Sequence, residues 1–171
     1  MKENHHTTMH EYRITKYNPA HRNEQGAYLK DEWTSFSDIG KIFDGEVLPK
    51  AQYEKVEAAY IDVALSFFIE SQSEACYIEY LENHASKPLP CKDENNLSPD
   101  ELRQLMKGIL REEYWARIEA DSFFVHFGWD YYMYVGVSQE CPKSIELATA
   151  KGLFVEPFLS PYNERTEVTK M

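Results

Sequence analysis

One histidine, His126, has neighbours suited to acid–base chemistry. It lies in the apolar run 122–127, and Glu119 and Asp121 closely precede it in the chain. A histidine changes charge near neutral pH and a nearby carboxylate can orient its ring, so this group could transfer a proton or hold a metal ion. A structural histidine that is hydrogen-bonded within a strand has the same signature. Without a supporting motif, we expect the structural role.

The rest of the sequence carries no catalytic signature. It has no glycine-rich phosphate loop, no His-Glu-x-x-His pair and no Gly-x-Ser-x-Gly elbow. The three cysteines, Cys76, Cys91 and Cys141, lie too far apart in the chain for a zinc knuckle or a redox dithiol. We therefore expect no cofactor and no metal site. An enzyme that uses His126 with Glu119 or Asp121 is kept as the alternative function.

Aromatic and acidic side chains in predicted loops indicate another kind of chemistry, the binding of a protein. Tyrosine and tryptophan offer a large contact area at low entropic cost, and carboxylates speed the capture of a basic partner. Tyr28 and Trp33 could instead anchor their loop to the core. Glu112 and Glu113 end a predicted helix against its dipole, either as a solvated end or as a hint of interaction. The predicted partner-binding residues are Tyr28, Asp31, Glu32, Trp33, Trp129 and Asp130.

Residues 114–137 contain the histidine with its acidic neighbours and two of the predicted partner-binding residues, Trp129 and Asp130. Aromatic and β-branched residues dominate the segment, and Gly128-Trp129-Asp130 supplies a tight reversal. This pattern predicts an antiparallel hairpin at the centre of a sheet, with 115–120 as a third strand. Successive residues of a strand face opposite ways, and here both faces are apolar. Helices or a layer of loops are therefore expected to cover most of the sheet.

The remaining periodicity predicts an α+β fold with a mainly antiparallel sheet. Apolar residues recur at three- and four-residue steps in the predicted helices, and alternate in the predicted strands. A single domain is expected over 9–162, with a disordered amino terminus at 1–8 and a loose tail at 163–171. A short helix is predicted to begin after Ser35 and to end at Asp44-Gly45. The longer predicted helices are 49–72, 98–112 and 141–152, the further strands are 9–17, 75–81 and 153–155, and a long loop is predicted at 18–33.

The charge balance favours some partners over others. The 171 residues contain 18 Lys and Arg against 29 Asp and Glu, a net charge of −11. Such a chain repels phosphate backbones, so no nucleic-acid partner is expected, whereas an acidic surface can attract a basic protein. No apolar run is long enough to span a bilayer, and the start lacks the apolar core of a secretion signal. We expect no membrane partner and a cytoplasmic location.

Several short runs carry a resemblance to known proteins. Residues 12–19 read Tyr-Arg-Ile-Thr-Lys-Tyr-Asn-Pro, 31–35 read Asp-Glu-Trp-Thr-Ser, 37–40 read Ser-Asp-Ile-Gly, and 152–156 read Gly-Leu-Phe-Val-Glu. Over most of 11–162 the sequence resembles a group of small, mostly uncharacterised bacterial proteins. Proteins of this appearance are often immunity proteins, which bind and block a basic toxin. The resemblance implies a non-enzymatic protein-binding function and carries over no functional residues.

Overall fold

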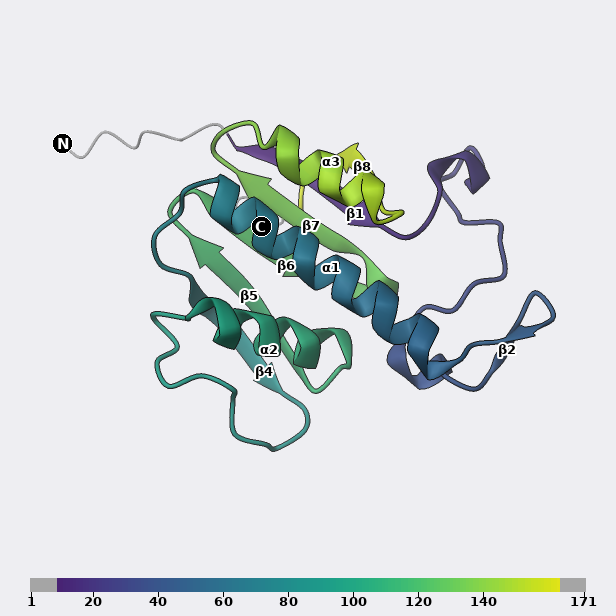
Figure 1. Ribbon diagram of the computed structural model, residues 1–171, viewed down its shortest axis with the longest axis horizontal. Coiled ribbons are helices and arrows are strands. Elements are labelled where there is room, and N and C mark those ends of the chain that lie inside the picture. Colours follow the sequence, from purple (N-terminus) through teal and green to yellow (C-terminus); the bar gives the residue numbers. More distant parts are fainter. Residues whose placement is uncertain (1–8, 164–171) are drawn as a thin grey trace, which may run out of the picture.

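A six-stranded antiparallel sheet forms the centre of the molecule (Figure 1). The computed structural model describes residues 9–163. The strands are β1 (His10–Thr15), β4 (Tyr77–Asn83), β5 (Tyr114–Ala120), β6 (Phe123–Phe127), β7 (Met133–Val137) and β8 (Phe154–Pro157). They lie in the order β4-β5-β6-β7-β1-β8, and every hydrogen-bonded pair is antiparallel. The aromatic-rich hairpin β6–β7 is therefore central, as its composition predicts.

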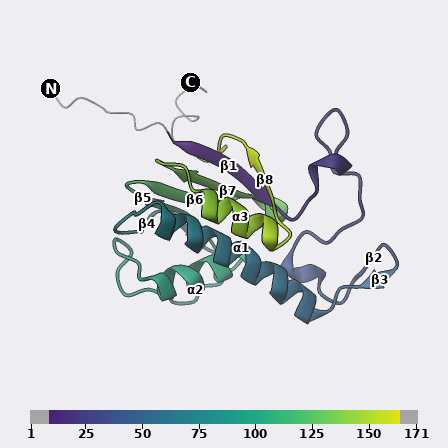
Figure 2. The ribbon, with the colours of Figure 1, turned by 45° about the horizontal axis from the view of Figure 1, so that its top comes forward.

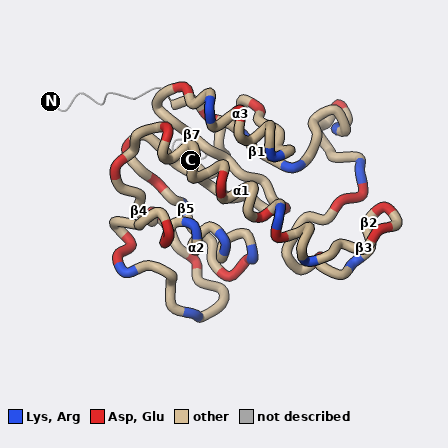
Figure 3. The backbone as a smooth tube through the Cα atoms, viewed as in Figure 1, with Lys and Arg blue, Asp and Glu red and all other residues tan. Residues whose placement is uncertain are grey.

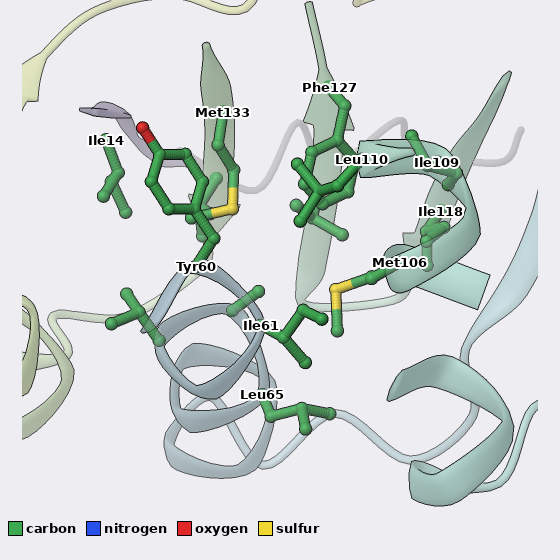
Figure 4. Close-up of a cluster of buried hydrophobic side chains, with 14 of the residues drawn as sticks. Ile14, Tyr60, Ile61, Leu65, Met106, Ile109, Leu110, Ile118, Phe127 and Met133 are labelled. Carbon is green, nitrogen blue, oxygen red and sulfur yellow. The ribbon is translucent and has the colours of Figure 1, made fainter. Parts of the chain in front are cut away.

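The α-helices of the described residues lie together on one face of the sheet, here called the front face (Figure 2). They are α1 (Lys50–Glu70), α2 (Pro99–Leu110) and α3 (Pro142–Ala150). The long helix α1 runs between α2 and α3 and packs against both. Its residue Tyr60 lies against Met133 of the sheet, whereas Ile61 and Leu65 point toward Met106 of α2 (Figure 4). Burial on more than one side explains why α1 is apolar around much of its circumference.

Shorter elements complete the fold. They are the 3₁₀ turns η1 (Pro19–His21), η2 (Phe36–Asp38) and η3 (Trp129–Tyr131), and the two-stranded hairpin of β2 (Ile42–Phe43) and β3 (Glu46–Val47). The β2–β3 hairpin projects from the body of the molecule near the start of α1 (Figure 1). The helix predicted after Ser35 is thus a single 3₁₀ turn.

The opposite, back face of the sheet is covered by residues 158–163, here called the C-terminal strap. The Phe158 amide donates a hydrogen bond to the Glu11 carbonyl, 3.1 Å away, and Arg117 Nη1 donates to the Tyr162 carbonyl at 3.1 Å. The Tyr134 ring lies between the two ends of the strap, with centroids 5.8 Å from Phe158 and 6.0 Å from Tyr162. Because both faces are covered, every residue of β6 and β7 is buried.

The predicted α+β class, the antiparallel sheet and the central hairpin are confirmed. The reversal of the hairpin is longer than predicted, because Asp130 and Tyr131 both have positive φ (61° and 67°) and β7 begins only at Met133. In β4 a bulge lies between Ile78 and Tyr80. The predicted segment 1–8, and the predicted tail apart from its first residue, lie outside the described residues.

Candidate functional site

The predicted acid–base residue His126 is fully buried on the back face. Its Nε2 lies 2.7 Å from Glu119 Oε1, its Nδ1 lies 2.7 Å from Ser160 Oγ, and its ring stacks on Phe124 with centroids 4.3 Å apart. The structure therefore brings His126 and Glu119 together, as the sequence suggests, and adds Ser160 from the strap. Asp121 lies in the exposed turn between β5 and β6 and does not join this group.

A line of serine, histidine and carboxylate is also the arrangement of a catalytic triad, but here it is closed to substrate. Ser160 is 1% exposed and His126 is 0% exposed. The Ser160 hydroxyl is held on a second side, since it accepts a hydrogen bond from the Tyr162 amide at 3.2 Å. A nucleophile must reach the atom it attacks. In this geometry the line fastens the C-terminal strap to β6 and β5.

The predicted binding loop is for the most part packed onto the body of the protein. Trp33 is only 6% exposed and its ring meets Tyr53 and Tyr131 at centroid distances of 5.2 and 5.0 Å. Glu32 accepts hydrogen bonds from the Tyr28 hydroxyl at 2.6 Å and from Lys16 Nζ at 2.9 Å. The loop is thus anchored by Trp33, which is not available to a partner.

Two other properties of this loop bear on its role. Burial lowers the pKa of the Lys16 ammonium, and the adjacent Glu32 carboxylate partly offsets this effect. Glu32 is therefore already paired within the protein. Asp31 is exposed, and its carboxylate accepts a hydrogen bond from the Asp44 amide at 2.8 Å, which ties the loop to the β2–β3 hairpin.

The tip of the central hairpin differs, because it displays a large aromatic ring on a fixed turn. Trp129 is 78% exposed, and Asp130 beside it is exposed as well. The Tyr17 hydroxyl donates to the Asp130 carbonyl at 2.6 Å, and the Tyr60 hydroxyl donates to the Tyr131 carbonyl at 2.8 Å. Burial raises the pKa of both phenols, so they remain protonated donors at neutral pH. The backbone of the turn is consequently fixed by the buried hydroxyl groups of Tyr17 and Tyr60.

A cavity of about 260 Å³ opens beside this turn. Its floor is apolar and largely aromatic, and its acidic side chains are Glu82, Glu112 and Asp130; no Lys or Arg lines it. The lining residues are Thr34, Ser35, Glu82, His84, Ile109, Leu110, Glu112, Tyr114, Trp115, Phe127, Gly128, Trp129, Asp130, Tyr131 and Tyr162. This cavity, with Trp129 at its edge, is called the hairpin-tip site below.

Antiparallel topology explains how distant parts of the chain meet here. The strands β4 and β6 end, and β5 begins, at the same end of the sheet, and the C-terminus of α2 lies there as well. Three residues that line the cavity, Glu112, Asp130 and Tyr131, have positive φ. Such backbone strain concentrates at functional sites and persists only where the surrounding structure enforces it.

Comparisons with protein-family models, with curated proteins and with solved structures gave no match. Among residues 9–163, no three His, Cys, Asp or Glu side chains converge as metal ligands. No helix in that range combines the length and apolar character needed to cross a membrane.

Sequence reasoning found only part of the hairpin-tip site. It identified Trp129 and Asp130, and the pair Glu112-Glu113 stood out because acidic residues oppose the dipole at the end of a helix. Glu82 lies in a segment of ordinary polar sequence and carries no local signal. Its membership follows from the pairing of β4 with β5, which brings Glu82 opposite Trp115.

Proposed function

We propose that this chain is a non-enzymatic binding domain that docks a basic protein at the hairpin-tip site, as an immunity protein does with a basic toxin. The proposal depends on the exposure of Trp129, which is 78% exposed at the border of an acidic cavity. The turn that carries Trp129 is fixed by two buried tyrosine hydroxyl groups. The resemblance of the sequence to small bacterial proteins of the immunity type supports the same function.

A preorganised tryptophan suits the energetics of docking. Binding energy concentrates in a few central residues, and Trp is among the types most often found there. A ring that is already held in place loses little conformational entropy on binding. The Trp115 indole strengthens this frame, because its Nε1 donates to the Phe127 carbonyl at 2.8 Å, directly before the turn. The turn therefore needs little ordering when a partner arrives.

The acidic residues of the site favour a basic partner. Glu82, Glu112 and Asp130 are exposed, and no Lys or Arg lines the cavity beside them. The basic residue in the lining is His84, whose Nε2 lies 3.4 Å from Glu82 Oε2. Elsewhere in the described chain, Asp and Glu residues occur along most of the elements (Figure 3). The net charge of −11 therefore contributes long-range attraction, and the hairpin-tip site contributes the location.

Acid–base catalysis at His126 receives less support. The histidine and its partner Ser160 are buried beneath the C-terminal strap, and neither lines the cavity. Catalysis would require residues 158–163 to leave the back face. This would break the hydrogen bond of Phe158 with Glu11 and that of Arg117 with Tyr162.

Affinity capture tests the proposed function. The wild-type chain and Trp129→Ala are used as baits in a lysate of the native host and against the products of neighbouring genes. The matched control is Ile69→Ala, which removes another exposed apolar side chain near the far end of α1. We expect a basic protein on the wild type and the control, and at least about tenfold weaker binding to Trp129→Ala. Equal capture by all three baits, or turnover of a small molecule without any protein partner, would overturn the proposal.

A further inference from the structure

We infer that the cavity of the hairpin-tip site receives a single lysine or arginine side chain of the partner, with its stem on the apolar floor and its cationic head among Glu82, Glu112 and Asp130. That the incoming side chain belongs to a protein rests on the proposed function. The preference of the cavity for a cationic group does not depend on that function, and it can be tested on this chain alone.

The size of the cavity suits one side chain. Pockets for drug-sized ligands have volumes of about 300–1,000 Å³. The volume here, about 260 Å³, lies below that range. The cavity also opens at the end of the strands, beside the exposed Trp129. A partner whose surface contacts Trp129 can therefore insert one side chain into the cavity.

The floor of the cavity matches the stem of a long cationic side chain. Ile109 and Leu110 from α2, Tyr114 from β5 and Phe127 from β6 supply its apolar surface, and all four are buried. Lysine and arginine bury their methylene stems along such surfaces while the charged head stays near water. The Trp129 ring adds a face over which an ammonium or guanidinium group can bind.

The rim of the cavity selects for positive charge. The side chains of Glu112 and Asp130 make no hydrogen bond or ion pair within residues 9–163, so both carboxylates are available to an incoming donor. Glu82 is partly engaged, because its Oε1 accepts a hydrogen bond from the Tyr80 hydroxyl at 3.1 Å and its Oε2 lies 3.4 Å from His84 Nε2. Each carboxylate oxygen can accept more than one hydrogen bond, so Glu82 keeps further acceptor capacity. Helix α2 ends at the cavity, and the negative end of its dipole adds to the preference for a cation.

Small probes test this inference by nuclear magnetic resonance of the full chain. The cationic probes are N-acetyl-arginine amide and N-acetyl-lysine amide, and N-acetyl-norleucine amide is the neutral control with a similar stem. The indole N–H signals of Trp129 and Trp115 report on the cavity, and the backbone amide signal of Glu74, which does not line it, serves as reference. We expect saturable shifts of the two reporters with dissociation constants of about 1 mM for the cationic probes. The neutral probe should bind at least about tenfold more weakly.

Charge-neutral variants complete the test. The double variant Glu82→Gln with Glu112→Gln should lose most of the preference for cationic probes, whereas the control Glu74→Gln, an exposed carboxylate between α1 and β4, should retain it. Equal binding of cationic and neutral probes, or equal behaviour of the two variants, would overturn the inference.

The outcomes for the two proposals are separable. Capture of a basic partner that depends on Trp129, together with no response to the probes, would refute the inference about the cavity and leave the binding function standing. Selective binding of the cationic probes without any protein partner would refute the binding function and leave a cation-selective cavity.

Discussion

Tyr60 uses its hydroxyl twice, and both contacts are buried or partly buried. The oxygen donates to the Tyr131 carbonyl at 2.8 Å and accepts from the Lys16 amide at 2.7 Å. It thereby joins the turn beneath Trp129 to the end of β1. Together with the Tyr17 hydroxyl, which binds the Asp130 carbonyl, this phenol on α1 fixes the turn that carries Trp129.

Removal of this hydroxyl should both destabilise the fold and loosen the turn. In Tyr60→Phe two backbone groups lose their partner, and we expect the free energy of unfolding to fall by about 2 kcal/mol. Urea denaturation measures this change, and the line width of the Trp129 indole signal measures the loosening. The control is Tyr132→Phe, since the Tyr132 hydroxyl makes no hydrogen bond within residues 9–163. Equal stability of the two variants would contradict the assigned role of Tyr60.

A partly buried ion pair gives a second prediction for individual residues. Glu57 of α1 is buried and accepts hydrogen bonds from Arg111 Nε at 2.8 Å and Nη2 at 3.0 Å. Arg111→Met would leave a carboxylate without its partner, and we expect a loss of about 3 kcal/mol in urea denaturation. The double variant with Glu57→Gln should recover part of that loss. Additive effects of the two substitutions would show that the pair is not coupled.

The sequence predicted individual residues unevenly. The sequence offers Glu119 or Asp121 as the carboxylate beside His126, and the structure places Glu119 there and leaves Asp121 in the exposed turn. Ser160 was not expected, since it reaches His126 from 34 positions further along, through a strap that has no periodic pattern. Trp33 has the residue type of a binding hot spot but packs in the core, and only its burial distinguishes it from Trp129.

At the scale of elements, one helix supplies the cap of another. The residue at the N-cap of α3, Cys141, makes no side-chain hydrogen bond to the helix. Glu70, the last residue of α1, accepts instead from the amides of Ser144 at 2.7 Å and Lys143 at 3.2 Å, and from the Ser144 hydroxyl at 2.7 Å. A carboxylate that is unfavourable at the end of its own helix is thus stabilised by the N-terminus of the next.

This cap predicts a pH dependence of stability. Burial alone would raise the pKa of Glu70, but the hydrogen bonds from Ser144 and Lys143 outweigh it, and the pKa falls below 4.5. The stabilisation is therefore complete above the unfolded value and is lost as the pH falls through the lowered pKa of the folded state. Glu70→Ala should cost about 1 kcal/mol at neutral pH. This difference from wild type should shrink as denaturation is repeated below about pH 4.5.

The control for this prediction is Glu74→Ala, which removes an exposed carboxylate close by in the chain. It should leave the acid dependence unchanged. A constant difference between Glu70→Ala and wild type across that pH range would contradict the capping role.

Among the elements, sequence reasoning succeeded where a periodic pattern and a local signal agree. The start of α2 is an example, since Ser98 and Glu101 form the predicted capping box. It failed where the backbone departs from regular alternation. The bulge in β4 reverses the faces after Ile78, so that Leu81, opposite Ala116, packs with the core on the same side as Ile78. No residue type in that strand signals the bulge.

In the whole molecule, both faces of the sheet are covered, and a cavity opens where several strands end. Helices cover the front face (Figure 2) and the C-terminal strap covers the back. The hairpin-tip site forms where the ends of β4, α2 and β6 meet, and Trp129 marks its border. The fold thus provides a rigid platform for one protruding aromatic ring and one acidic cavity.

We propose that a basic partner docks at the hairpin-tip site. Hydrogen–deuterium exchange of the chain, measured free and with the captured partner, locates the docking surface. We expect slower exchange at 82–84, 112–115 and 127–131 in the complex, with 23–31 and the β2–β3 hairpin unchanged. Protection confined to the latter two segments, with the hairpin tip exchanging as it does in the free chain, would contradict it.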